Sequence, residues 1–211
     1  KRAISSKNAI PVLSTIKIEV QNSNITLTGS NGQISIENII PTSNENAGLL
    51  ITSPGAILLE ANFFINIVSS LPDVTLDFEE IEHHQIVLTS GKSEITLKGK
   101  DVDLYPRLQE MATENPLVIE TKLLKSIITE TAFAASLQES RPILTGVHMV
   151  LSDHKDFKAV ATDSHRMSQR KLTLDNTSNN FNVVIPSKSL REFAAVFTDD
   201  IETAEVFFSD S

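Results

Sequence analysis

The strongest constraint on the fold is an internal repeat. Residues 11–16 read Pro-Val-Leu-Ser-Thr-Ile, and residues 142–147, 131 positions later, read Pro-Ile-Leu-Thr-Gly-Val. Extended runs follow both segments, with Leu27 set against Val160 at an offset of about 133, and residues 59–64 align with 185–190 at an offset of 126. Offsets that drift in loops while the apolar pattern stays in step indicate a duplicated domain. The alternative is chance similarity between β-rich segments.

Length and composition fit two domains. The chain has 211 residues, 40% of them hydrophobic and 21% charged, which allows each repeat a core of its own. We predict a first domain over 1–113 and a second over 117–211, with the proline-containing stretch 105–116 as the connector. The first copy begins within a helical pattern, and the last predicted strand, 204–208, has no hairpin partner after it. We therefore expect further material at both ends. No apolar run is long enough to span a bilayer.

Helical and extended patterns occur in both repeats. Apolar residues at helical spacing predict helices from Lys122 to about Gln138, from Phe63 to Leu71, and through Leu190 to Phe197 with Ser187 as the N-cap. Helices combined with antiparallel strands predict an α+β fold. Alternating or β-branched runs predict the strands, at 15–20, 25–28, 34–40, 74–78, 86–89, 94–98, 147–151, 157–162, 166–174 and 183–185.

Charge is unevenly distributed along the chain. The net charge of −9 argues against a nucleic-acid binder with a uniformly basic surface. A basic helical face could nevertheless follow a phosphate backbone through charge alone. The alternative is an ordinary solvated helix face. The acids gather in predicted strands and turns, at Asp73, Asp77, Glu79, Glu80 and Glu82, whereas two helical segments carry basic pairs three residues apart, Lys122 with Lys125 and Lys188 with Arg191.

Catalytic and metal-binding motifs are weak. Residues 90–93, Ser-Gly-Lys-Ser, end like a phosphate-binding loop, but Ile86 stands where the first glycine should be. Asp163, Ser164 and His165 are the residue types of a hydrolase triad, yet neighbours in an extended segment point to opposite sides. The five histidines lack metal-ligand spacing, and the absence of cysteine favours a reducing compartment. We expect no active site, no metal and no cofactor.

One segment is unusual for a plain strand and turn. Residues 160–167, Val-Ala-Thr-Asp-Ser-His-Arg-Met, have a polar centre that differs from the matching segment 27–32 of the first copy. Together with residues 141–146, Arg-Pro-Ile-Leu-Thr-Gly, and 104–108, Leu-Tyr-Pro-Arg-Leu, this segment closely resembles the β subunit of bacterial DNA polymerase III, the sliding clamp. The resemblance extends in order over the whole chain.

The resemblance implies a ring around DNA. In this family a head-to-tail homodimer carries three copies of one α+β clamp domain per subunit, with antiparallel sheets outside and two helices per domain inside. This chain would hold most of the first domain and part of the second, without the third. The implied function is that of a cytoplasmic processivity factor with no active site. The implied partners are double-stranded DNA bound without sequence preference, the catalytic subunit of DNA polymerase III, the clamp loader complex and other proteins with a clamp-binding motif.

The resemblance also implies site residues. The family's partner pocket lies at the junction of the second and third domains, and glycine and leucine often stand where this chain has Ser164 and Met167. Those two departures should change the pocket's shape modestly. The second-domain wall of the pocket carries over onto Leu144, Thr162, Ser164, His165, Arg166 and Met167. Family DNA contacts match Lys7 and Gln138, 131 residues apart, and charge placement adds Lys122, Lys125, Lys188 and Arg191.

Two other interpretations stay open. The chain could be a peptide-binding scaffold without a DNA role, in which case substituting Lys7, Lys122 or Lys188 would not weaken any DNA association. It could also belong to an enzyme whose site lies outside this chain. An enzyme would need convergent titratable groups in a cleft, which this sequence does not offer.

Overall fold

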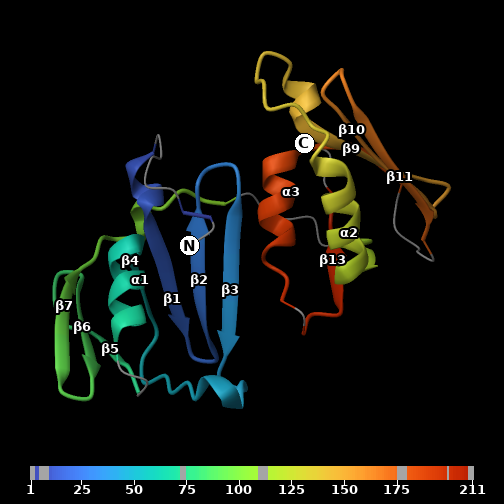
Figure 1. Cartoon of the computed structure of the whole chain (residues 1–211). Coiled ribbons are helices and arrows are strands. Elements are labelled where there is room, and N and C mark those ends of the chain that lie inside the picture. The colour runs from blue at the N-terminus through green and yellow to red at the C-terminus, as the bar shows by residue number, and fades with distance from the viewer. Residues whose placement is uncertain are drawn as a thin grey trace. The chain divides into compact units, whose positions relative to one another are not determined.

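The chain folds into two compact units. The computed structural model describes residues 3–4, 10–71, 75–108, 114–174, 180–198 and 200–208. The units are Lys1–Leu108 and Gln109–Ser211 (Figure 1). Each combines antiparallel sheets with helices, which confirms the predicted α+β class. None of the helices in the described ranges is long and apolar enough to cross a membrane.

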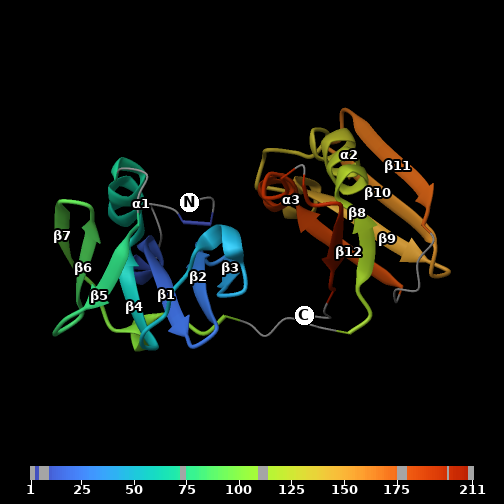
Figure 2. The same cartoon turned by 90° about the horizontal axis from the view of Figure 1, so that it is seen from below.

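The first unit contains two antiparallel sheets, with strand orders β3-β2-β1-β4 and β5-β6-β7. Helix α1 (Ala61–Ser70) follows directly on β4 and packs beside the strands (Figures 1 and 2). The hydrophobic core of the first unit includes Ile18 and Leu59 from the larger sheet and Ile86 and Leu88 from the smaller sheet. The strands are β1 (Thr15–Gln21), β2 (Asn24–Ser30), β3 (Ser35–Pro41), β4 (Gly55–Glu60), β5 (Asp77–Glu80), β6 (Gln85–Ser90) and β7 (Ser93–Lys98).

The second unit contains a four-stranded sheet, β11-β10-β9-β12, and a two-stranded pair, β13-β8. Helices α2 (Thr121–Ala132) and α3 (Ser187–Ala194) lie side by side on one face of the larger sheet (Figure 2). Val147, Met149 and Leu151 alternate along one strand and point into the core beneath these helices. The strands are β8 (Leu117–Glu120), β9 (Gly146–Ser152), β10 (Asp156–Thr162), β11 (Met167–Thr173), β12 (Phe181–Pro186) and β13 (Thr203–Val206).

The two larger sheets are copies of each other. Short 3-10 turns, η1 (Pro11–Ser14) and η4 (Pro142–Thr145), precede β1 and β9 at an offset of 131. Ile18 pairs with Leu27, and its counterpart Met149 pairs with Ala159, so the second strands match at an offset of 132. The predicted match of Leu27 with Val160 is therefore wrong by one residue. Such a slip would turn every side chain of the strand to the opposite face.

All three helices differ from prediction at their ends. Helix α2 stops at Ala132, well before Gln138, because the amides of Ala134 and Ala135 bond only three residues back and the amide of Ser136 bonds to Leu144 instead. The apolar pattern continues because Ala134 and Ala135 are buried in a turn. Ser187 is the first residue of α3 and makes no capping bond. The first helix begins at Ala61, where the Glu60 carboxylate caps the N–H of Phe63.

Several extended segments were missed or misplaced. The predicted strand 74–78 corresponds to β5, which covers Asp77–Glu80. Strands β4 and β8 were not predicted, because their sequences do not alternate between apolar and polar residues. The predicted last strand is β13, and its partner is β8 earlier in the chain, where Thr203 lies opposite Glu120, 203 − 120 = 83 positions away. Tyr105 is not part of a free connector. It follows the turn η3 (Val102–Leu104) and is buried with Leu13 and Leu58 in a small cluster.

Candidate interaction sites

The loop between β10 and β11, residues 162–167, is closed by its own hydrogen bonds. Asp163 Oδ1 accepts the backbone N–H groups of His165 and Arg166 at 3.0 and 2.9 Å. Thr162 Oγ1 accepts the N–H of Ser164 at 3.1 Å and donates to the carbonyl of Arg166 at 2.7 Å. This is an Asx turn, in which side chains replace backbone partners. The loop's conformation is therefore set without a ligand.

Arg166 is oriented by two contacts. Its Nε donates to Asp163 Oδ2 at 2.9 Å, and its guanidinium lies 5.7 Å from the centroid of the Phe133 ring, within cation–π range. Backbone N–H groups of His165 and Arg166, assisted by the charge of Arg166, hold the pKa of the Asp163 carboxyl below its ordinary value. The ionised carboxylate thus anchors both the turn and the side chain at its rim.

Ser164 adopts a left-handed backbone, with φ of 77°. The assumption of an extended segment at this position is therefore wrong, since a left-handed residue forms a turn. Glycine adopts such a φ at no steric cost, which gives a physical reason for the glycine common in the related family. Ser164 Oγ accepts a hydrogen bond from Arg141 Nη1 at 3.3 Å, a contact that links the loop to the start of η4.

Apolar side chains are exposed beside this loop. Ile143 in η4 is 71% exposed and Met167 at the start of β11 is 68% exposed, while Leu144 is half-buried. Met167 pairs with Thr162 across the two strands, and η4 is tied to the loop through Arg141. All six predicted pocket residues therefore lie around one loop of the second unit. Exposed apolar groups beside fixed polar ones are typical of a recognition surface.

The first unit contains the same turn with different side chains. Asn31 Oδ1 accepts the N–H groups of Gln33 and Ile34, both at 2.9 Å, and Gly32 has a φ of 86°. At the offset of 132, Asn31 corresponds to Asp163 and Gly32 to Ser164. The two units thus share the backbone of this loop. Their side chains differ, and at its tip His165, Arg166 and Met167 stand where the first unit has Gln33, Ile34 and Ser35.

The surface next to this turn is filled in the first unit. Tyr105 covers Leu13 and Leu58, which are only 2% and 0% exposed. Burial raises the pKa of Tyr105, as expected for a phenol removed from water. The counterparts of Leu13 and Leu58 in the second unit are Leu144, half-buried, and Val184, 42% exposed. At the offset of 126 that matches Leu58 with Val184, the position of Tyr105 corresponds to 231, beyond the 211 residues of this sequence, so the comparison concerns only the residues beneath it.

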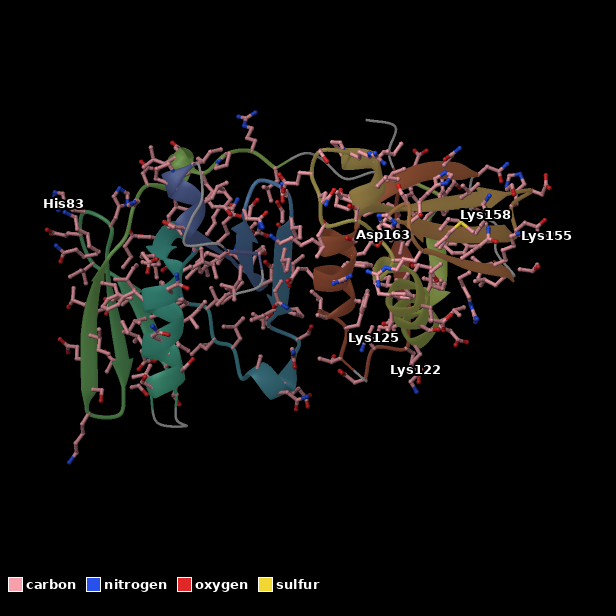
Figure 3. The ribbon with its side chains drawn as sticks, turned by 45° about the horizontal axis from the view of Figure 1, so that its top comes forward. His83, Lys122, Lys125, Lys155, Lys158 and Asp163 are labelled. Atoms are coloured by element: carbon pink, nitrogen blue, oxygen red, sulfur yellow. The ribbon has the colours of Figure 1, made fainter. Side chains whose placement is uncertain are left out.

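The basic residues predicted to face DNA lie on α2 and α3. Lys122 and Lys188 each occupy the second position of a helix, and neither helix has an acid in its first turn. The backbone N–H groups at a helix start carry partial positive charge, which reinforces the attraction of a lysine for phosphate. Figure 3 shows Lys122 and Lys125 together on α2. Both α2 and α3 thus combine a lysine with a positive helix end.

Two other predicted DNA contacts occupy different positions. Arg191 donates from Nη2 to the carbonyl of Ala132 at 2.8 Å and so caps the last turn of α2. Gln138 is exposed in a turn after α2, where its N–H bonds to Ser136 Oγ at 3.0 Å. Lys7 lies outside the described residues. The structure thus assigns Arg191 a stabilising contact between helices that charge placement alone did not indicate.

The discarded motifs occupy ordinary structural positions. Residues 90–93 form the tight turn between β6 and β7, with Gly91 at a φ of 61°. His148 Nε2 lies 2.6 Å from Asn182 Oδ1 on the neighbouring strand. Among the residues that the structure describes, no group of histidine and acidic side chains could hold a metal ion.

Sequence reasoning missed the supporting role of Asp163, which was weighed only as a triad member. The signal was available, because Asn31 stands at the matching position of the first copy and Asx side chains close turns of this kind. Phe133 and Ile143 were also missed. Exposed apolar residues cannot be distinguished from core residues by type alone.

Comparison with known proteins agrees with this arrangement. Residues 1–109 match the family described as DNA polymerase III beta subunit, N-terminal domain, and residues 118–211 match its central domain. The chain is 75% identical over its whole length to a beta sliding clamp of Streptococcus pneumoniae and 56% identical to one of Lactococcus lactis. It covers 56% of each relative, so it spans about half the length of the curated relatives it matches.

Solved structures show the same fold. The beta subunit from the DNA polymerase of Streptococcus pyogenes superimposes with a TM-score of 0.95 at 80% identity, over 99% of this chain and 55% of that one. The DNA polymerase sliding clamp from Bacillus subtilis gives a TM-score of 0.94 at 39% identity, over 99% and 55%. The duplicated unit, its sheets and its helices are thus shared with these proteins.

Proposed function

Because the chain belongs to the family of the DNA polymerase III β subunit, the bacterial sliding clamp, we propose that it forms two domains of a ring-shaped processivity factor. The ring encircles duplex DNA in the cytoplasm and tethers the replicative polymerase, without catalysing a reaction itself. The domains are 1–113 and 117–211, and a third domain completes each subunit of a head-to-tail homodimer. The chain's 56% coverage of its relatives agrees with such a longer protein.

Contact with DNA runs through α2 and α3. Lys122 and Lys188 at the helix starts, with Lys125 one turn along, attract phosphates without reading bases. Lys7 and Gln138 are further contacts, and Arg191 contributes by fixing α2 against α3. Contacts made only to the backbone are weak and independent of sequence, which allows the ring to slide.

Partner proteins bind beside the 162–167 loop. The observation that carries this proposal is the exposure of Ile143 and Met167, 71% and 68%, beside a loop that Thr162 and Asp163 hold closed. A segment with apolar side chains can pack against these residues and the half-buried Leu144, as Tyr105 packs on Leu13 in the first unit. Thr162, Ser164, His165, Arg166 and Met167 form the loop side of this pocket, where Arg166 and His165 supply donors at the rim. The catalytic subunit, the clamp loader complex and other proteins with a clamp-binding motif share it.

Homodimerisation uses the first unit. Strand β7 is an edge strand of its sheet, and beside it a depression of about 380 Å³ is lined by Phe63, Ile67 and Ile95. Phe63 is 58% exposed. An open edge beside apolar side chains suits pairing with another sheet.

The test uses a protein of the relatives' length that contains this chain. It is loaded on nicked circular DNA with its clamp loader and ATP, washed in high salt, and the circle is then cut. Charge-only binding collapses in the wash, because phosphate contacts are salt-sensitive. A clamp survives the wash and slides off after the cut. Loss from intact circles, with a loader shown to be active on another clamp, would contradict the ring and favour a scaffold without a DNA role.

A further inference from the structure

The outer faces of the two larger sheets differ in charge. In the first unit Glu19, Thr26 and Ile39 are neighbours across β1, β2 and β3. At the matching positions of the second unit stand Val150, Lys158 and Lys171, neighbours across β9, β10 and β11. Phe157 and Ala159, which flank Lys158, are buried, so Lys158 points away from the core. Glu19 is thus replaced by a valine in the second copy, and Thr26 and Ile39 by two adjacent lysines.

The two lysines lie directly opposite each other on adjacent strands. Like charges in that arrangement destabilise a sheet. Asp156 is the nearest acid on the same face of β10, yet within the described residues no ion pair joins either lysine to a carboxylate. In the first unit, by contrast, Lys17 is paired with Glu19 at 2.7 Å. Asp156 lines the same depression, so two lysines and one acid leave a net positive charge on this part of a protein whose net charge is −9.

A shallow depression accompanies this charge. It measures about 450 Å³, and its lining includes Val150, Lys158 and Lys171. Val160 lies two residues after Lys158 on the same face of β10 and is half-buried. Figure 3 shows Lys155 and Lys158 on the strand side of the second unit, apart from Lys122 and Lys125 on α2. The patch is therefore separate from the basic helices.

We propose that this patch, defined by Val150, Lys158, Val160 and Lys171, binds an acidic, extended segment of a protein partner. In an extended peptide, carboxylates two residues apart lie about 6.6–7 Å from each other on one side, within reach of two neighbouring lysine ammonium groups. Apolar side chains farther along the same side of the peptide contact Val150 and Val160. The site does not depend on the pocket beside residues 162–167, although both lie on the second unit.

Charge complementarity favours an acidic peptide over nucleic acid. A phosphate backbone carries charges along its whole length and is matched by a long basic stripe. Here the positive charge is confined to a few side chains above valines, and acids elsewhere on the protein repel a polyanion that is long enough to extend beyond the patch. Complementary charge of this kind speeds association and excludes wrong partners.

The test is an NMR titration of the whole chain with a blocked hexapeptide of alternating glutamate and valine. Amide shifts are expected at Val150, Lys158 and Lys171, and binding should weaken with added salt. Lys158→Glu with Lys171→Glu should weaken binding by about tenfold, because each reversed surface charge contributes a few-fold. The same variant should bind the alternating lysine–valine peptide instead.

Two controls separate the patch from general charge. Lys92→Glu with Lys98→Glu changes the net charge equally at exposed positions of the first unit and should leave binding intact. Lys158→Thr with Lys171→Ile restores the residues of the first copy, keeps the sheet folded and should weaken binding several-fold, less than the charge reversal does. Equal weakening by both charge-reversal pairs, shifts centred on Lys122 and Lys188, or tighter binding of a single-stranded oligonucleotide to this face would each overturn the proposal.

Discussion

The two units share a backbone and differ in what they present to the outside. Both contain the η turn, the four strands in the same register and the Asx turn after the second strand. The first unit closes its apolar site with Tyr105 and pairs its outer lysine with an acid. In the described residues of the second, Val184 is exposed, and no ion pair joins Lys158 or Lys171 to a carboxylate. The two copies thus share the core side of the sheet and differ in the side chains on its outer side.

Removing the Tyr105 side chain should cause the largest change in the free energy of unfolding. Tyr105→Ala should lower the free energy of unfolding by about 3–5 kcal/mol, because it leaves a cavity above Leu13 and Leu58. Chemical denaturation of the chain measures the change. Val184→Ala, at the matching site of the second unit, should cost less than about 1 kcal/mol, since the side chain is 42% exposed. Equal costs would mean that the first unit's site is not closed by its own chain.

Arg191 and Lys188 should separate stability from DNA contact. Arg191→Met removes the charged hydrogen bond to the carbonyl of Ala132 and should destabilise the second unit by about 1 kcal/mol. Lys188→Met, one turn earlier on the exposed face of α3, should leave unfolding unchanged and weaken DNA association of the longer protein. Thermal unfolding and salt-dependent DNA binding distinguish the two. A stability loss in the Lys188 variant alone would reverse these assignments.

A reciprocal exchange tests the shared turn. Ser164→Gly should stabilise the second unit by about 0.4–1 kcal/mol, since glycine adopts a φ of 77° without strain. Gly32→Ser should destabilise the first unit by a similar amount, because its φ is 86°. Chemical denaturation measures both. Changes of the same sign would show that the two turns are not equivalent.

Substituting Asp163 should have the smallest effect on global stability, and its main effect should be on hydrogen exchange within the loop. Asp163→Asn should preserve the turn, because Asn31 makes the same backbone bonds in the first unit, whereas Asp163→Ala should lose the hydrogen-exchange protection of the His165 and Arg166 amides. In both variants Arg166 loses its carboxylate partner. Full protection in the alanine variant would show that the side chain does not hold the turn.

The same turn should respond to acid. The pKa of Asp163 is lower in the folded loop than its ordinary value of 3.8, so the folded loop binds fewer protons than the unfolded chain. Its contribution is present above pH 3.8 and is lost as the pH falls through the lower, folded value. Exchange protection of the Arg166 amide, followed downward from neutral pH, should disappear in that acidic range while Asp163→Asn shows no such step.

The sequence predicted the repeat and the fold class because both rest on periodicity. Alternating runs located β1, β2, β9 and β10 to within one or two residues. Strand β4 escaped because three consecutive residues are buried without alternation, and β8 because its alternating burial covers only four residues. The alignment of Leu27 with Val160 was wrong by one residue because short apolar runs align equally well in two registers when the strand pairing is unknown.

The candidate sites were less predictable. The family motif located the 162–167 loop, but only the structure reveals that Asp163 anchors it and that Phe133 supports Arg166. Arg191 was predicted from charge to contact DNA, whereas its partner is a carbonyl 59 positions earlier in the chain. Such long-range contacts leave no local pattern. Tyr105 was assigned to a connector because neighbouring prolines suggest a loop, although the tertiary fold buries it.

The most direct test of the contrast between the units is a crosslinking measurement. A photoreactive phenylalanine analogue replaces either Met167 or its exposed counterpart Ser35 in the protein of the relatives' length, which is then irradiated with the catalytic subunit of DNA polymerase III. The account predicts a crosslinked product from position 167 and none from position 35. A product from position 35, or none from position 167 in a complex that remains intact by sizing, would contradict it.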